Sequence, residues 1–295
     1  MNGRYIHLFD TTLRDGAQTQ GVDFSLHDKS LIAKALDDLG LDYIEGGWPG
    51  ANPTDNDFFQ QSLGLKKAKL VAFGMTRRSG YSAQNDPGLN DIVNSKSHCA
   101  CLVAKSWDFH VDVALAIERD ENLKMIASSI EYAHSKKGEA MLDCEHFFDG
   151  YKANREYALQ CALSGFEAGA RWIVLCDTNG GTLPHEIAEI VHEVAHHIPG
   201  EYLGIHAHND TGNAVANSLA AVFSGACQVQ GTINGLGERC GNADIINMIA
   251  TLAFKTDFKI GIEKEKLKQL TQISKLLDIQ INRASNKHQP WVGSA

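Results

Sequence analysis

Tyr202-Leu-Gly-Ile-His-Ala-His-Asn-Asp210 shows the pattern that decides the fold, because a short apolar run ends abruptly in residues that carry chemistry. The apolar part has the length and composition of a buried β-strand. Residues i and i+2 of a strand lie on one face, so His206 and His208 can point at one ion. Near the N-terminus, residues 6–9 form another apolar run, which is followed by Arg14 and Asp15. Two imidazoles and a carboxylate suit a borderline divalent cation.

Short β-rich runs of this kind alternate with helical patterns along the whole chain. We predict strands at residues 7–9, 43–45, 70–73, 100–104, 140–143, 172–176, 202–205 and 228–232. Residues 26–39 and 157–168 repeat apolar residues with the period of a helix, and Gly40 and Gly169 lie where helix C-caps are expected. Eight β-then-α units in about 250 residues is the count for a closed parallel barrel. The predicted fold is therefore α/β, a (β/α)8 TIM barrel.

Two rival folds are open at this point. A doubly wound sheet is one, although it more often has about five to seven strands. A dinucleotide-binding fold is the other, prompted by Gly235-Leu-Gly-Glu-Arg-Cys-Gly241. That stretch does not have the spacing G-x-G-x-x-G and follows the last predicted strand instead of the first, so the barrel is favoured.

Composition and charge argue against several classes of protein. The 295 residues carry a formal net charge of −9 and no Lys/Arg block, which disfavours nucleic acid or an anionic membrane as the main partner. No apolar stretch approaches the ~18 residues that span a bilayer, and residues 1–21 lack the core of a signal peptide, so we expect a cytoplasmic protein. The seven cysteines form no Cys-x-x-Cys pair, which favours reduced buried thiols over disulfides or a cysteine zinc site.

Polar residues follow every predicted strand, and in a barrel these positions meet at the C-terminal mouth, where active sites form. For any single residue a solvated loop charge is the ordinary explanation. A cluster at one end of eight successive strands is harder to explain in that way. The residues are Asp10, Arg14, Asp15, Glu45, Arg77, Arg78, Lys105, Glu145, His146, Asp177, Thr178, Asn179, His206, His208, Asn209, Asp210, Asn234, Glu238, Arg239 and Asn242.

Three stretches resemble the signatures of one metal-dependent barrel family, which includes 2-isopropylmalate, homocitrate and citramalate synthases and HMG-CoA lyase. They are Leu8-Phe-Asp-Thr-Thr-Leu-Arg-Asp-Gly16, His206-Ala-His-Asn-Asp210 and Gly235-Leu-Gly-Glu-Arg-Cys-Gly-Asn242. Tyr43-Ile-Glu-Gly-Gly-Trp-Pro-Gly50 and Asp143-Cys-Glu-His-Phe-Phe-Asp-Gly-Tyr151 look most like the citramalate synthase branch. The resemblance spans nearly the whole chain, and its three motifs occur in the right order.

The resemblance implies a role for each matched residue. Asp15, His206, His208 and Asn242 would ligate a divalent metal, Mn²⁺, Zn²⁺ or Mg²⁺. Arg14 would face the developing negative charge and Thr178 would hold the substrate carboxylate. Glu145 would take part in proton transfer, for which a water activated by another residue is the alternative. We expect Asn234 and Gly237 to contact acetyl-CoA, and Glu45 to lie at the substrate and anchor Arg14. Apart from the resemblance, two roles are open for Asp10 and Asp177, which are orienting Arg14 or the histidines and direct catalysis.

The implied reaction is a Claisen condensation of acetyl-CoA with a 2-oxo acid, catalysed by an acyltransferase. We expect pyruvate as the acceptor and (R)-citramalate, a step toward isoleucine, as the product, made by a homodimer. Alternatives are a 2-isopropylmalate or homocitrate synthase, a hydroxyacyl-CoA lyase, and a non-catalytic regulatory barrel. The lyase branch uses a cysteine in its last glycine-rich loop. Cys240 lies closer to Asn242 than in that arrangement, so we interpret Cys240 as structural.

The resemblance also predicts how the chain is divided. We expect residues 1–260 to form the catalytic barrel and residues 261–295 to form a C-terminal helical extension that begins a linker. Residues 267–277 have helical periodicity. Relatives continue into a regulatory domain, which we expect to be absent here, so the 295 residues should turn over slowly without feedback inhibition.

Overall fold

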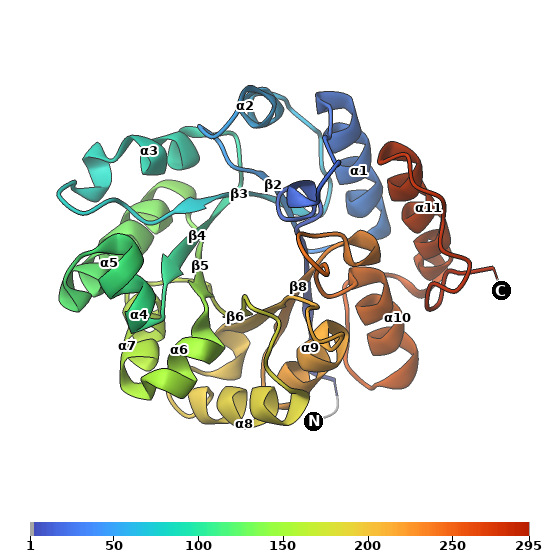
Figure 1. Ribbon diagram of the computed structural model, residues 1–295. Coiled ribbons are helices and arrows are strands. Elements are labelled where there is room, and N and C mark those ends of the chain that lie inside the picture. The colour runs from blue at the N-terminus through green and yellow to red at the C-terminus, as the bar shows by residue number, and fades with distance from the viewer. Residues whose placement is uncertain (1–2, 295) are drawn as a thin grey trace.

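Eight parallel strands close into a barrel in the computed structural model, which describes residues 3–294. Neighbouring strands pair in chain order, and the last strand returns to the first through the register His7↔Gln228 to Asp10↔Gly231. Figure 1 looks along the barrel and shows the helices as a ring around the strands. The predicted (β/α)8 TIM barrel is confirmed, and the doubly wound alternative is wrong because such a sheet stays open.

The strands are β1 (His7–Asp10), β2 (Tyr43–Gly47), β3 (Lys69–Met75), β4 (Cys99–Lys105), β5 (Ala140–Glu145), β6 (Trp172–Asp177), β7 (Leu203–Ala207) and β8 (Gln228–Gly231). The helices are α1 (Leu26–Leu39), α2 (Pro53–Gln60), α3 (Pro87–Asn94), α4 (Asp108–His110), α5 (Arg119–Lys137), α6 (Phe147–Ala153), α7 (Arg155–Glu167), α8 (Pro184–Val194), α9 (Ala214–Phe223), α10 (Ile245–Lys255) and α11 (Leu270–Gln280). All strands but β8 end later than the sequence predicts, because polar residues such as Asp10, Glu145 and Asp177 still belong to the sheet.

Helix α1 shows how local chemistry sets the limits of an element. Ser25 Oγ accepts from the Asp28 amide at 3.2 Å, and the Asp28 carboxylate accepts from the Ser25 amide at 2.9 Å. This reciprocal pair satisfies two of the amides that a helix start leaves free. The helix ends at Gly40, whose φ of 108° is left-handed and favours glycine. The observed bounds equal the predicted ones.

Each strand buries side chains on both faces. Along β6, Trp172, Val174 and Cys176 fill the barrel interior, whereas Ile173 and Leu175 join the larger core between the strands and the helices. Burial on both faces is usual for parallel strands and makes them continuous apolar runs instead of alternating ones. This is why short apolar runs located the strands correctly.

The seven cysteines are free, as predicted. Six of them are buried, and Cys240 is exposed. Burial raises the pKa of thiols such as Cys101 and Cys144 well above the usual range, and at Cys101 the neighbouring carboxylates of Asp143 and Glu45 add to this. These buried thiols are packing residues of the core.

The C-terminal residues lie against the barrel wall. Helix α11 packs on α1, and residues 281–294 contain no helix or strand. This last segment is held by two side-chain hydrogen bonds, from Gln289 Nε2 to Asp244 at 2.9 Å and from Trp291 Nε1 to Asn247 at 3.1 Å. Among residues 3–294, no helix combines the length and the apolar character needed to cross a bilayer.

Candidate active site

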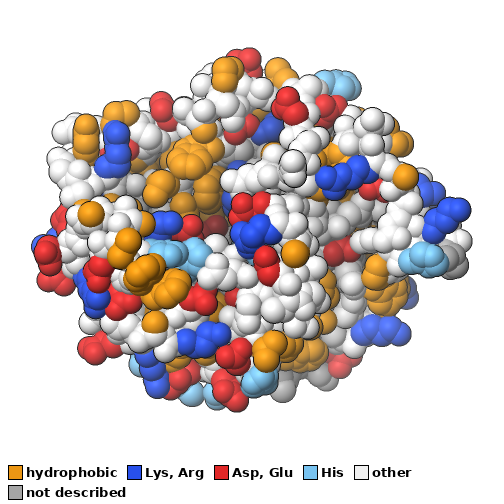
Figure 2. All heavy atoms as spheres, in the orientation of Figure 1, with side chains coloured by type: hydrophobic (Ala, Val, Ile, Leu, Met, Phe, Trp, Pro, Cys, Tyr) orange, Lys and Arg blue, Asp and Glu red, His pale blue; other side chains and the backbone are white. Residues whose placement is uncertain are grey.

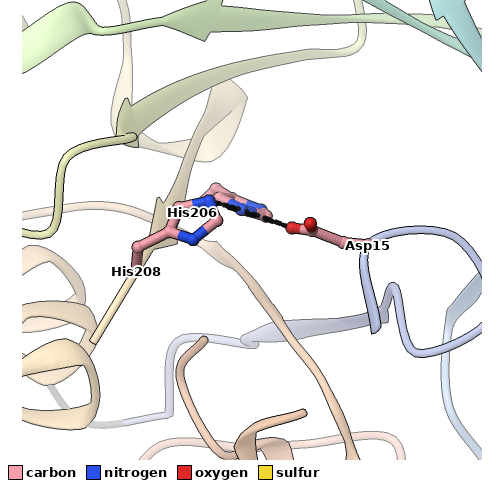
Figure 3. A group of neighbouring side chains, drawn as sticks. All are labelled: Asp15, His206 and His208. Carbon is pink, nitrogen blue, oxygen red and sulfur yellow. Dashed lines mark hydrogen bonds and ion pairs between the residues drawn. The ribbon is translucent and has the colours of Figure 1, made fainter. Parts of the chain in front are cut away.

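Three buried ligand-type side chains converge at the C-terminal mouth of the barrel. Asp15 comes from the turn after β1, His206 from the end of β7 and His208 from the residues that follow it (Figure 3). His206 Nε2 lies 3.1 Å from Asp15 Oδ2 and 3.3 Å from His208 Nε2. His208 Nε2 lies 3.9 Å from the same carboxylate oxygen. The predicted convergence of the two histidines on one point is therefore present.

The donor set fits a divalent cation. The three ligand atoms all lie within 4.8 Å of one another, and all three residues are buried. Close lone pairs that have been removed from water repel one another unless a proton or a cation lies between them. Two imidazole nitrogens and one carboxylate suit a borderline divalent ion that keeps open positions for substrate.

Asn242 completes the cluster. It forms an antiparallel bridge with His208, which carries it from the loop after β8 to the end of β7. Its Nδ2 donates to Asp15 Oδ2 at 2.6 Å and lies 3.4 Å from His206 Nε2. Its Oδ1 is buried without a hydrogen-bond partner. Ligation through Oδ1 requires a rotation of the carboxamide that exchanges the positions of Oδ1 and Nδ2. Oδ1 then lies beside Asp15 and His206.

The electrostatics favour the ionisation states that metal ligands need at Asp15 and His208. At His206 burial lowers the pKa, but the hydrogen bond and the charge of Asp15 outweigh burial and raise it. Burial opposes the charge on Asp15, but the Arg14 guanidinium and then His206 outweigh it and hold its pKa well below the usual range. Burial, followed by the charge of His206, lowers the pKa of His208 to about 3. Asp15 is therefore an anion and His208 a neutral imidazole at neutral pH.

Arg14 is fixed from two sides. Its Nε donates to Glu45 Oε2 at 2.7 Å, and its guanidinium carbon lies 3.9 Å from the centre of the Phe73 ring. Its Nη1 lies 3.5 Å from Asp15 Oδ1. Glu45 is fully buried behind Arg14 and does not line the cavity. The expected anchoring role of Glu45 agrees with this geometry, whereas its expected place at the substrate does not.

A cavity of about 260 Å³ opens beside these residues. One wall is apolar, and the rest carries the polar groups. The apolar wall consists of Trp48, Phe73, Met75 and Val103, and the polar lining includes Arg14, Asp15, Lys105, Glu145, Thr178, His206, His208 and Glu238. In Figure 2, orange side chains lie along one side of a hollow on this face of the molecule. A small ligand with one apolar end and one charged end suits such a cavity.

Glu145 and Thr178 line this cavity. Glu145 forms an ion pair with Lys105, which the neighbouring strand β4 supplies at the same level, since Lys105 is the register partner of Glu145. Thr178 Oγ1 accepts from the His146 amide at 2.9 Å. The Thr178 hydroxyl hydrogen is therefore directed elsewhere and is able to donate to a ligand.

Asn234 and Gly237 lie on a second, larger cavity of about 810 Å³ between the last barrel loop and the C-terminal segment. The Asn234 side chain donates to the Ser274 carbonyl and to Asp278, each at 3.1 Å, so it holds α11 in place. A Cβ at Gly237 would lie 2.1 Å from Asn242 Oδ1. Glycine at 237 is thus required by the approach of Asn242.

Some residues at strand ends are directed away from the site. Arg77 pairs with Glu121, and Arg78 pairs with Asp86. Asp10 accepts from Thr12, and Asp177 accepts from Thr182 and Asn217. The expectation that Asp10 and Asp177 orient Arg14 or the histidines is therefore wrong for the described residues. The Asp10 carboxylate binds the turn after its own strand, and the Asp177 carboxylate binds the turn after β6 and helix α9.

Sequence reasoning missed several residues of the site. The apolar wall was not predicted, because large apolar side chains such as Phe73 and Met75 are more often core residues than site residues. It also missed Gln230, whose Oε1 lies 2.8 Å from His206 Nδ1. The available signal was a polar glutamine within a predicted strand, where a buried amide needs hydrogen-bond partners.

The known proteins that this chain resembles in sequence belong to one family of enzymes. A family model described as HMGL-like matches residues 5–277. The chain is 49% identical over 292 residues to the (R)-citramalate synthase of Aquifex aeolicus, with 98% of this chain and 55% of that protein covered. It is 34% identical to the 2-isopropylmalate synthase 1 of Caldanaerobacter subterraneus, with 94% and 69% covered.

The chain spans about half the length of the citramalate synthases that it matches. Among solved structures, the HMG-CoA lyase of Bacillus subtilis aligns with a TM-score of 0.79 at 20% sequence identity, and 96% of this chain and 95% of that chain are covered. At this level of identity the likeness supports the fold alone.

Proposed function

The chain belongs to the HMGL-like family, and we propose that it is a catalytic barrel that condenses acetyl-CoA with pyruvate to give (R)-citramalate and CoA. The family expected from the three sequence motifs is confirmed. The observation that carries the proposal is the 49% identity to an (R)-citramalate synthase over 98% of the chain, against 34% to a 2-isopropylmalate synthase. The small cavity with one apolar wall suits the methyl group of pyruvate.

We propose that Asp15, His206, His208 and Asn242 hold a divalent metal, for which Mn²⁺, Zn²⁺ and Mg²⁺ are the candidates. The convergence of the first three within 4.8 Å supports this. When bound, such an ion supplies Lewis acidity toward a chelated 2-oxo acid. The protein's own side chains bind the acceptor and remove the proton.

Arg14 and Thr178 bind the acceptor in this scheme. Arg14 is held by Glu45 with its Nη groups toward the cavity, where it neutralises the oxygen that becomes negative when the keto carbon is attacked. The free hydrogen of the Thr178 hydroxyl donates to the substrate carboxylate. The apolar wall of Trp48, Phe73 and Met75 faces the acceptor methyl group and excludes water from it.

Glu145 removes the proton. Its carboxylate takes one hydrogen from the acetyl-CoA methyl group, the electron pair of that C–H bond forms the new C–C bond to the keto carbon, and the keto oxygen receives the displaced pair. Lys105, which is paired with Glu145, balances the carboxylate charge before the proton arrives. Water then hydrolyses the thioester, which releases CoA.

The cavity of about 810 Å³ suits acetyl-CoA, the second substrate. We propose that acetyl-CoA contacts Asn234 and Gly237 there, with Lys275 and Lys287 in the lining available to its phosphates. We also propose that the protein is a cytoplasmic homodimer and that it acts in isoleucine biosynthesis. Sedimentation of the purified chain tests the dimer.

The function is tested by following CoA release with a thiol reagent. Pyruvate, 2-oxobutyrate, 2-oxoisovalerate and 2-oxoglutarate are offered with acetyl-CoA, before and after treatment with a chelator. We expect the highest kcat/KM with pyruvate, loss of turnover after chelation and recovery when Mn²⁺ is returned. Preference for 2-oxoisovalerate would identify a 2-isopropylmalate synthase instead, and turnover that survives thorough chelation would overturn the metal-dependent mechanism.

A further inference from the structure

A chain of two buried hydrogen bonds runs from His206 across the barrel interior. Gln230 is the register partner of His206 on the adjacent strand β8, and its Oε1 lies 2.8 Å from His206 Nδ1. Its Nε2 donates to Asp143 Oδ1, on β5, at 3.1 Å. Gln230 is 0% exposed, and Asp143, which borders the small cavity, is 3% exposed, so both bonds lie largely out of water.

The chemistry of the three groups gives the direction of both bonds whenever Oδ1 of Asp143 carries no proton. A carboxylate only accepts hydrogen bonds, so Asp143 Oδ1 requires the NH₂ end of the Gln230 amide. This holds also when Asp143 carries a proton on its other oxygen. The amide oxygen then faces His206, and an amide oxygen only accepts. Nδ1 of His206 must therefore carry the hydrogen.

The consequence appears at the opposite ring nitrogen. A neutral His206 with hydrogen on Nδ1 has a lone pair on Nε2, which is the nitrogen 3.1 Å from Asp15 Oδ2 and 3.3 Å from His208 Nε2. In the other tautomer, Nε2–H would donate to Asp15 and block the point where the ligand atoms converge. The ring would also lose its bond to Gln230.

We propose that Gln230 is a positioning residue that holds His206 in the Nδ1–H tautomer, and that Asp143 sets the orientation of Gln230. The inference rests on the proposed metal site and deepens it. Groups that orient a ligating histidine in this way typically contribute 10- to 100-fold to metal affinity. Here a neutral amide does so, with a carboxyl group on a strand across the barrel deciding which way the amide points.

The experiment compares Gln230→Met with Gln228→Met. Both glutamines are 0% exposed on β8, and methionine conserves their volume. Among the described residues, Gln228 forms no hydrogen bond with His206, and its Nε2 donates to the Met141 sulfur at 3.9 Å. We expect Gln230→Met to weaken Mn²⁺ or Co²⁺ binding about 10- to 100-fold in calorimetric titration, with Gln228→Met close to the parent.

A second readout does not need metal. Nitrogen-15 NMR of histidine-labelled, metal-free protein at alkaline pH, where the rings are neutral, reports the tautomer of His206 directly. We expect Nδ1–H in the parent and in Gln228→Met, and growth of the Nε2–H form in Gln230→Met. Asp143→Asn should give an intermediate result, because an asparagine accepts either orientation of the Gln230 amide.

The outcomes separate the two levels of the proposal. A parent that binds no metal but shows the Nδ1–H tautomer would contradict the metal site and leave the positioning role standing. Equal metal affinity in Gln230→Met and Gln228→Met, or an Nε2–H ring in the parent, would overturn the positioning role. Thermal unfolding shows whether each variant folds. If Gln230→Met does not fold, the tautomer of His206 in Asp143→Asn tests the positioning role instead.

Discussion

The carboxylate of Glu45 lies 2.7 Å from Nε of Arg14, fully buried behind it at the mouth of the barrel. This contact leaves the Nη groups of Arg14 directed toward Asp15 and the small cavity. Because Phe73 stacks on the guanidinium from one side, Arg14 has little freedom to rotate. A fixed donor loses less entropy when charge develops in front of it than a mobile one does.

Arg14→Lys tests whether that geometry matters for catalysis. A lysine keeps the charge but cannot bond to Glu45 and to a substrate oxyanion at once, so we expect metal content to stay and turnover to fall ~10²–10³-fold. Elemental analysis and steady-state CoA release measure the two effects. Arg78→Lys, where the exposed Arg78 pairs with the buried Asp86, is the matched control and should leave both unchanged. Turnover of Arg14→Lys within a few fold of the parent would mean that Arg14 is only structural.

The double variant His206→Ala, His208→Ala should lose the divalent metal. Removing two of three converging ligands leaves Asp15 as the only strong donor, which cannot hold an ion against water. The matched control is His192→Ala, His196→Ala, an exposed pair near the end of α8 with ring centres 4.9 Å apart. Metal content is measured on purified protein after dialysis. If the two double variants retain equal metal, the ligand assignment is wrong.

Glu145→Gln should stop proton removal while acceptor binding survives. General-base catalysis of this kind contributes ~10²–10⁴-fold, and we expect a loss of that size in CoA release. Exchange of deuterium from solvent into the acetyl-CoA methyl group, measured by mass spectrometry, isolates the step. Glu238→Gln is the control, since Glu238 also lines the cavity but pairs with Arg239 at 2.7 Å. Unimpaired exchange in Glu145→Gln would assign the base to another group.

Met75→Ala should widen acceptor choice. The side chain forms part of the apolar wall, and its loss opens space for one further methylene group. One methylene in an apolar pocket changes discrimination by about 10- to 200-fold, so the ratio of kcat/KM for 2-oxobutyrate over pyruvate should rise within that range. Leu183→Ala, which removes a similarly exposed apolar side chain elsewhere, should not change the ratio. An unchanged ratio in Met75→Ala would place the acceptor against another wall.

Asp10 gives a prediction for the pH dependence of stability. Burial raises its pKa from 3.8 to about 7, despite hydrogen bonds from Thr12 that lower it. Between these two values the folded chain binds a proton that the unfolded chain has lost, so the free energy of unfolding decreases as pH rises and levels off above pH 7. The contribution is on the order of 4 kcal/mol for a shift of this size.

Asp10→Asn should remove that slope, because an amide does not titrate. Urea unfolding between pH 5 and 8 measures it, and the free-energy difference between Asp10→Asn and the parent should grow in favour of the variant as pH rises. A difference that is constant with pH would show that Asp10 ionises normally in the folded protein. Asp28→Asn, at the exposed cap of α1, would lower stability by a similar amount at each pH in this range.

Much of the barrel could be predicted because its signals are local. A parallel strand that is buried on both faces is a continuous apolar run, and such runs located all eight strands within a few residues. The pair His206 and His208 was predicted for the same reason, since the two-residue period of a strand places both on one face. Ser25 and Gly40 likewise bound α1 through contacts within the helix itself.

The sequence by itself therefore determined the barrel, the pair of histidines and the family, since these depend on short periods and contiguous motifs. The tertiary structure alone decided which polar residue after each strand enters the cavity, because loop dihedral angles follow no period. It directed Arg77 outward to Glu121, placed Glu45 behind Arg14, and brought Gln230 to Asp143, 87 residues away in the chain. Contacts of this kind exist only once the sheet has closed, because closure brings distant strands within hydrogen-bond reach in the barrel interior.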